Sequence, residues 1–151
     1  RTGELLRGIT ERWRVHLVDG GSDVTKRPLP TIWSTLEYAC HVRDVFRIYD
    51  RRLALMLEFD DPLFENWDQD RTAVEDDYAH QDPSTVSAQL VAAAATLAAR
   101  FDAVSDDQWR RRGRRSDGSA FTVDSIARYL IHDPVHHVHD VGADVPRYES
   151  L

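Results

Sequence analysis

Four long segments of this sequence repeat apolar residues every three or four positions, and no segment shows a convincing strand-like alternation of apolar and polar residues. A helix turns by about 100° per residue, so this spacing gathers the apolar side chains on one face. The segments span residues 3–18, 31–59, 85–104 and 121–141. Amphipathic helices bury their apolar faces against one another, so the sequence predicts an all-α four-helix bundle.

Short-range signals mark where these helices should begin and end. Ser34 and Glu37 have the spacing of a capping box at the start of the second helix. That helix is long for a globular protein, so we expect a bend or break near Arg51. Ser84 is the expected N-cap of the third helix, and Thr122 that of the last.

The connection between the second and third helices is long and acidic. It spans residues 60–83, contains two prolines, and is expected to form a short helix at residues 73–78. Long ordered connections in small domains are often functional. We therefore expect a four-helix bundle with a long crossover connection, and residues 1–151 to form one domain.

The composition excludes several classes of protein. A net charge of −7 argues against general affinity for nucleic acid, which requires a basic surface. No apolar run approaches the ~20 residues that span a bilayer, and no signal peptide is seen. A single cysteine, Cys40, excludes an internal disulfide framework and fits a reducing cytoplasm. We expect a soluble cytoplasmic protein with neither a nucleic-acid nor a membrane partner.

Four of the seven histidines lie in one stretch of eight residues, 132–139, in the last helix. His132 and His136 are one helical turn apart on one face, which lets both imidazoles point at one divalent metal ion. His139 continues this stripe but lies about 10 Å along the axis from His132, so the three cannot share one ion comfortably. A pair formed by His136 and His139 is the alternative, and His137 points elsewhere.

A third ligand has to come from another helix, and His41 in the second helix is the best candidate. Glu37 and Asp44 lie four and three residues from it on the same face. Either carboxylate is a candidate ligand, or an acceptor that fixes the tautomer of the imidazole. Three neutral histidines leave a coordination position open, which is typical of catalytic rather than structural metal sites.

Pro134 lies between the two paired histidines and leaves two alternatives open. The proline removes a helical hydrogen bond, so the helix would bend and re-aim His136. Alternatively, a new helix starts with Asp133 as its cap and Pro134 in its first turn, which would place His132 outside it.

The motifs WSTLEYACHVRDVF and YLIHDPVHHVHDV resemble those of the DinB family, also called the DinB/YfiT-like metalloenzymes. This family includes the metal-binding domain of mycothiol-dependent maleylpyruvate isomerase, and the resemblance spans nearly the whole chain. It implies a four-helix bundle with a metal ion, commonly zinc or nickel. The ion is held by a histidine of the second helix and an HxxxH pair of the last. The matching residues here are His41, His132 and His136.

Other residues are candidates for the surroundings of this site. In the acidic connection, Trp67 could wall a pocket while Asp68 or Asp70 binds a ligand, although a loop anchored by Trp67 and capped by its aspartates is favoured. Five arginines at residues 110–115 suit a carboxylate or a polar cofactor group, although a solvated loop is favoured. Cys40 is expected to be a buried apolar residue.

Three functions are compatible with these features. The first is a metal-dependent enzyme, either a mycothiol-type transferase or isomerase that activates a low-molecular-weight thiol, or a hydrolase that activates water. The second is a non-catalytic stress-response protein that binds a metal or a small ligand. The third is a metal-free scaffold whose histidines only pack. We expect a homodimer, and a small-molecule thiol or other small substrate as its partner.

Overall fold

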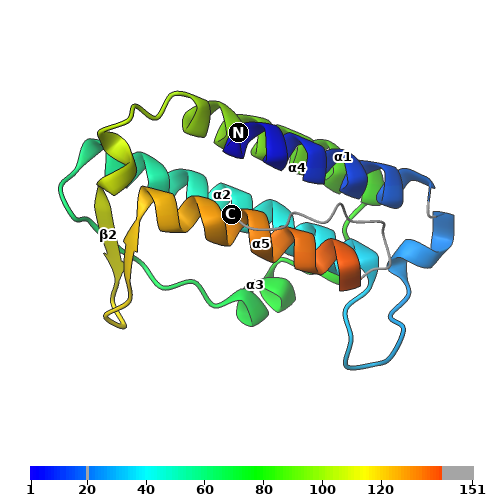
Figure 1. Cartoon of the computed structure of the whole chain (residues 1–151). Helices are drawn as coiled ribbons and strands as arrows, with labels where there is room; N and C mark the ends of the chain where they lie inside the picture. The colour runs from blue at the N-terminus through cyan, green and yellow to red at the C-terminus, as the bar shows by residue number, and fades with distance from the viewer. Residues whose placement is uncertain (20, 141–151) are drawn as a thin grey trace.

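The computed structural model describes the backbone of residues 1–19 and 21–140 and the side chains of residues 1–18 and 23–132. Four long helices lie along one another, as Figure 1 shows. They are α1 (Thr2–Asp19), α2 (Thr35–Glu58), α4 (Pro83–Asp102) and α5 (Val123–Asp140). The predicted four-helix bundle is confirmed.

The order of the helices around the bundle is α1, α4, α2 and α5, with α5 also packed against α1. Helices α2 and α4 run in the same direction, because the chain between them returns along the length of the bundle (Figure 1). This return is the predicted crossover. It contains strand β1 (Leu63–Phe64), helix α3 (Gln69–Glu75) and the 3₁₀ turn η2 (Tyr78–His80). The short helix expected at residues 73–78 therefore begins earlier than predicted, at Gln69.

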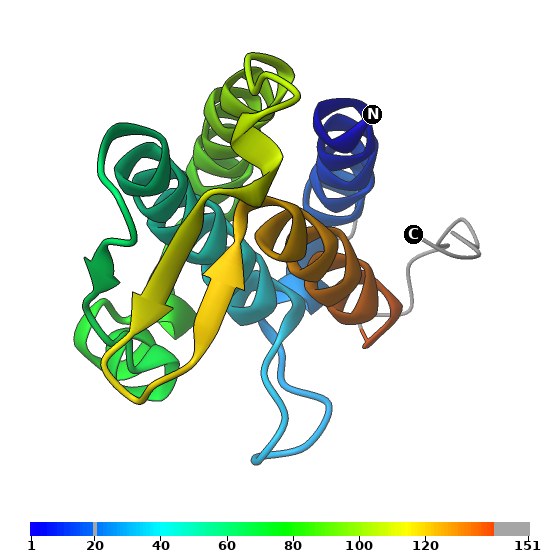
Figure 2. The same cartoon turned by 60° about the vertical axis from the view of Figure 1, so that its left-hand side comes forward.

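A small sheet lies at one end of the bundle (Figure 2), in segments where the sequence shows no convincing strand pattern. Strands β2 (Arg112–Arg115) and β3 (Ala120–Thr122) form an antiparallel hairpin, and β1 pairs with β2 in parallel. Two further 3₁₀ turns are η1 (Gly21–Thr25) and η3 (Gln108–Arg110). Strands of two to four residues are too short to show an alternating pattern, and here their pairing defines them.

The helix ends agree with the predicted caps at two of three positions. Ser34 and Glu37 form the capping box of α2, and Thr122 accepts a hydrogen bond from the backbone N–H of Ser125 at the start of α5. The cap of α4 is Asp82 rather than Ser84, because the residue after Asp82 is a proline that suits the first helical position. Helix α2 continues to Glu58 without a break.

The core is one cluster of buried apolar side chains drawn from all four long helices and the connection. Its largest fully buried members are Trp13, Tyr78, Phe46 and Phe64. Small residues bring α1 and α4 close, since a Cβ added at Gly3 would lie 2.9 Å from the carbonyl oxygen of Ala98. No helix in the described part of the chain is both long and apolar enough to cross a membrane.

We predict that Gly113→Ala destabilises the protein by about 1–3 kcal/mol, because the added Cβ overpacks the junction of β2 with the bundle. A Cβ at this buried position would lie 2.3 Å from Cζ of Phe64 and 3.0 Å from Cγ of Met56. Urea unfolding measures the loss, with Arg112→Ala on the exposed neighbour as the control. Equal stability of both variants would contradict this account of the packing.

Candidate metal centre

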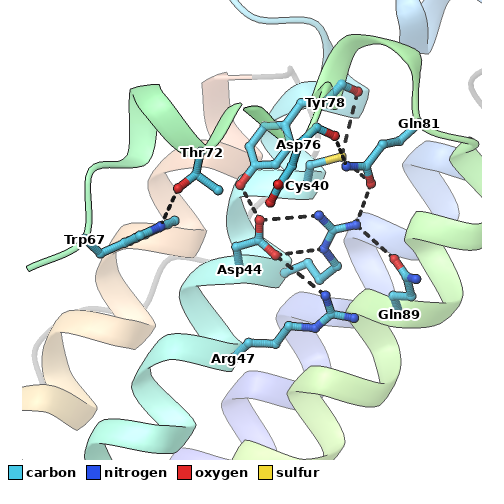
Figure 3. Close-up of polar contacts among 10 residues, drawn as sticks. Cys40, Asp44, Arg47, Trp67, Thr72, Asp76, Tyr78, Gln81 and Gln89 are labelled. Carbon is cyan, nitrogen blue, oxygen red and sulfur yellow. Dashed lines mark hydrogen bonds and ion pairs between the residues drawn. The ribbon is translucent and has the colours of Figure 1, made fainter. Parts of the chain in front are cut away.

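His41 lies on the buried side of α2, with its ring packed against two indoles. The residue is 3% exposed. The ring of Trp67 stacks on it with centroids 5.7 Å apart and planes 7° apart, and Trp33 lies 5.5 Å away at a tilt of 53°. Trp67 is held in turn by a 2.8 Å hydrogen bond from its Nε1 to Oγ1 of Thr72, as Figure 3 shows. Packing from the connection therefore restricts the orientation of the His41 ring.

His132 lies on α5, which packs against α2, and its side chain is exposed. The side chain of His136, like those of His137 and His139, lies outside the described residues. Among the side chains that the structure describes, no group of three His, Cys, Asp or Glu residues could hold a metal ion. The three-histidine set therefore stays a prediction. Helix α5 passes through Pro134 without ending, which agrees with one continuous helix rather than a restart.

Glu37, a candidate partner of His41, is bound to Arg27 and to the start of α2. Its carboxylate accepts hydrogen bonds of 2.7 and 2.6 Å from Arg27, and one oxygen also accepts from the backbone N–H of Ser34. Burial disfavours the charge, but the bonds from Arg27 and Ser34 outweigh it and lower the pKa of Glu37. This carboxylate fixes the start of α2.

Asp44 is likewise engaged in a polar network that joins α2 to the connection and to α4 (Figure 3). It pairs with the guanidinium of Arg43 at 3.0 Å and accepts the hydroxyl of Tyr78. Arg43 also donates to the side chains of Gln81 and Gln89, at 2.7 and 2.9 Å. Burial, together with the neighbouring carboxylate, raises the pKa of Tyr78 and keeps its phenol protonated. Asp44 therefore stabilises the fold. Its role beside His41, as a metal ligand or as the acceptor that fixes the tautomer of the imidazole, stays a prediction.

The acidic residues after Trp67 follow the favoured structural alternative. Asp68 is the N-cap of α3 and accepts a 3.0 Å hydrogen bond from the backbone N–H of Arg71. Asp70 lies exposed in the first turn of α3. Trp67 contacts the candidate ligand His41, so the connection does contribute a wall to this site.

The arginine-rich segment is largely a strand with structural contacts rather than the solvated loop that was expected. Arg111 donates to the carbonyl oxygens of Met56 at 2.6 Å and Phe59 at 2.9 Å, which satisfies the last turn of α2. Arg114 in β2 forms a 3.1 Å ion pair with Asp61.

Trp33 is the neighbour of His41 that sequence reasoning missed. It precedes the N-cap Ser34, and its indole lies against the rings of Tyr38, His41 and Tyr78. A large aromatic residue just before a helix cap commonly folds back over the first turns. The position of Trp33 directly before the cap Ser34 was the sequence signal for this contact.

Cys40 is a buried free thiol, as expected, beside Gln81 and the carbonyl oxygen of Tyr78. Burial raises the pKa of Cys40 from 9.0 to about 12. We predict that thiol reagents modify native Cys40 very slowly at pH 8 and modify the urea-unfolded chain rapidly. The raised pKa stabilises the fold below about pH 9, and this contribution is lost as the pH rises towards 12. Fast labelling of the native protein would contradict this.

The comparisons with known proteins agree with this architecture. A family model described as the DinB superfamily matches residues 4–141. A similar solved structure is YfiT from Bacillus subtilis, described as a probable metal-dependent hydrolase with an unusual four-helix bundle topology. The two chains superimpose with a TM-score of 0.82 at 19% identity, over 93% of this chain and 81% of YfiT. This likeness shows a shared fold. No curated protein sequence matches the chain significantly.

Proposed function

This chain belongs to the DinB superfamily, and we propose that it is a metal-dependent enzyme whose ion is held by His41, His132 and His136. The observation that carries the proposal is the setting of His41. It is a buried histidine, packed against two indoles, on the helix that packs against the HxxxH helix α5. The description of YfiT as a probable metal-dependent hydrolase supports a divalent ion.

The donor set fits a borderline-soft divalent ion. Imidazole nitrogen suits zinc and nickel, and three histidines leave room for a fourth ligand from solvent or substrate. His41 would be the fixed member, because Trp67 and Trp33 restrict its ring. A divalent ion in such a site lowers the pKa of a water or thiol that reaches it, so that the nucleophile forms near neutral pH.

The nearest carboxylates on α2 are not available as general bases. Glu37 is occupied by Arg27, and Asp44 by Arg43 and Tyr78. Activation of the nucleophile would then depend on the ion rather than on these side chains. The indoles of Trp33 and Trp67 would orient His41 and keep water from one side of its ring.

Two nucleophiles are compatible with this site, namely water in a hydrolase and a low-molecular-weight thiol of the mycothiol type in a transferase or isomerase. Tag-free protein loaded with zinc or nickel should be assayed for ester hydrolysis without thiol. It should also be assayed for conjugation of an electrophile with mycothiol, bacillithiol or glutathione. We expect metal-dependent turnover in one of the two assays. This turnover should be lost when the metal is chelated and in the His41→Ala variant. Absence of turnover from every arm would favour a non-catalytic metal-binding protein.

A further inference from the structure

Arg52 on α2 is a buried cation without an acidic partner. It is 7% exposed, and its Nη2 donates to the carbonyl oxygen of Glu65 at 3.0 Å. Its guanidinium lies over the rings of Tyr49 and Phe64, at 5.1 and 5.3 Å from their centroids. Among the described side chains, no carboxylate forms an ion pair with it. Buried charges are usually paired, so this guanidinium has unused capacity for an anion.

A cavity of about 280 Å³ opens beside this guanidinium. Its walls come from α2, the connection, β2 and α5, and they include the side chains of Tyr49, Arg52, Asn66, Trp67, Arg115 and Tyr129. Most of these groups are hydrogen-bond donors or can act as donors. Burial raises the pKa of Tyr49 above its ordinary value of 10.0, and the phenol is protonated at neutral pH.

Arg115 supplies a second cation at the wall of the cavity. Its Nη2 is bonded to Oγ of Ser119 at 3.0 Å and lies 3.2 Å from the carboxylate of Asp117. Its Nε is buried and has no hydrogen-bond partner among the described residues. The walls of the cavity thus contain two guanidinium groups and one carboxylate, that of Asp117. The net charge of these three groups is one positive charge, which suits a ligand with a single negative charge.

We propose that this cavity binds the carboxylate group of a small anionic ligand between Arg52 and Arg115. The planar guanidinium fork suits a carboxylate, and the buried setting strengthens such charge-assisted bonds. Burial lowers the pKa of Arg52, Tyr49 opposes this shift, and the neighbouring Arg115 adds to it. An anion between the two guanidinium groups would offset the burial of this charge. A carboxylate matches the single positive charge better than a dianionic phosphate.

The position of the cavity relates it to the candidate metal centre. Trp67 both lines the cavity and stacks on His41. Arg52 follows His41 by eleven residues, which returns it to within ~20° of the same face of α2. On α5, Tyr129 lies one turn before His132. Arg52 and His41 are about 16 Å apart along the axis of α2, so only a ligand of that length would join the two sites, and this link alone rests on the proposed function.

The test titrates tag-free protein with benzoate, with neutral benzamide and with inorganic phosphate, and follows binding by NMR chemical shifts. We expect benzoate to bind at least about tenfold more tightly than either of the others. Arg52→Gln, Arg115→Gln and the milder Tyr129→Phe should each weaken benzoate binding. Arg112→Gln, which removes an exposed arginine of β2 with the same charge change, should not.

Equal binding of benzoate and benzamide would overturn the proposal, as would tighter binding of phosphate. Full affinity in folded Arg115→Gln would also overturn it, so the test does not depend on the more buried Arg52. His132→Ala separates this inference from the proposed function. Loss of metal with unchanged benzoate binding in that variant supports the anion site whether or not the enzyme proposal holds.

Discussion

Replacing His41, His132 and His136 together by alanine is expected to abolish stoichiometric zinc or nickel binding. Each single replacement should weaken the apparent affinity by more than about 100-fold, because loss of a direct ligand exceeds the 10–100-fold effect of losing a group that only supports one. Elemental analysis of tag-free protein, followed by competition with a chelator, measures both quantities. Unchanged metal content in the triple variant would refute the three-histidine site.

Matched histidine variants identify the ligand pair on α5. His139→Ala should keep full metal content if His132 and His136 are the ligands. If His139→Ala lost metal and His132→Ala retained it, the alternative pair of His136 and His139 would be favoured instead. His80→Ala serves as a general control, since His80 is exposed and bonded to Asp77.

Asp44→Ala is expected to cause a large loss of stability, about 3–5 kcal/mol, because it leaves Arg43 buried without its counter-charge. Tyr78 loses the acceptor of its hydroxyl in the same variant. The network links α2 to the connection and to α4, so the loss should appear in the global unfolding transition rather than as local fraying. Urea unfolding followed by circular dichroism measures the change in the free energy of unfolding.

Asp50→Ala is the matched control for this prediction. Asp50 lies on the same helix and pairs with Arg100, but that pair is partly open to solvent. Such exposed pairs contribute about 0–1 kcal/mol. If both variants lost the same stability, the buried network would not be the main link between α2 and the connection.

Long periodic segments made the helices predictable, because many residues contribute to each pattern. The capping box of Ser34 and Glu37 is local and was also predictable. The cap of α4 was assigned to Ser84 although Asp82, directly before Pro83, is the better candidate. Strand β1 pairs with β2 from about 50 residues away, so no local pattern predicts it. Strands β2 and β3 form a local hairpin, but four and three residues are too few to show an alternating pattern.

The site was predictable in its residue types and not in its surroundings. His41 could be proposed from spacing and resemblance, but its contact with Trp67 follows from how the connection packs on α2. Arg52 looks like an ordinary solvated helix residue in the sequence. It is buried because Phe64 and Glu65 of the connection cover it, which is a tertiary effect.

The most direct test of the central claim is anomalous diffraction at the zinc or nickel edge from crystals of tag-free, metal-loaded protein. We predict one strong anomalous peak per chain, about 2.0–2.1 Å from one ring nitrogen each of His41, His132 and His136. A strong peak held by other residues, or none in protein that binds metal stoichiometrically in solution, would contradict the proposed site.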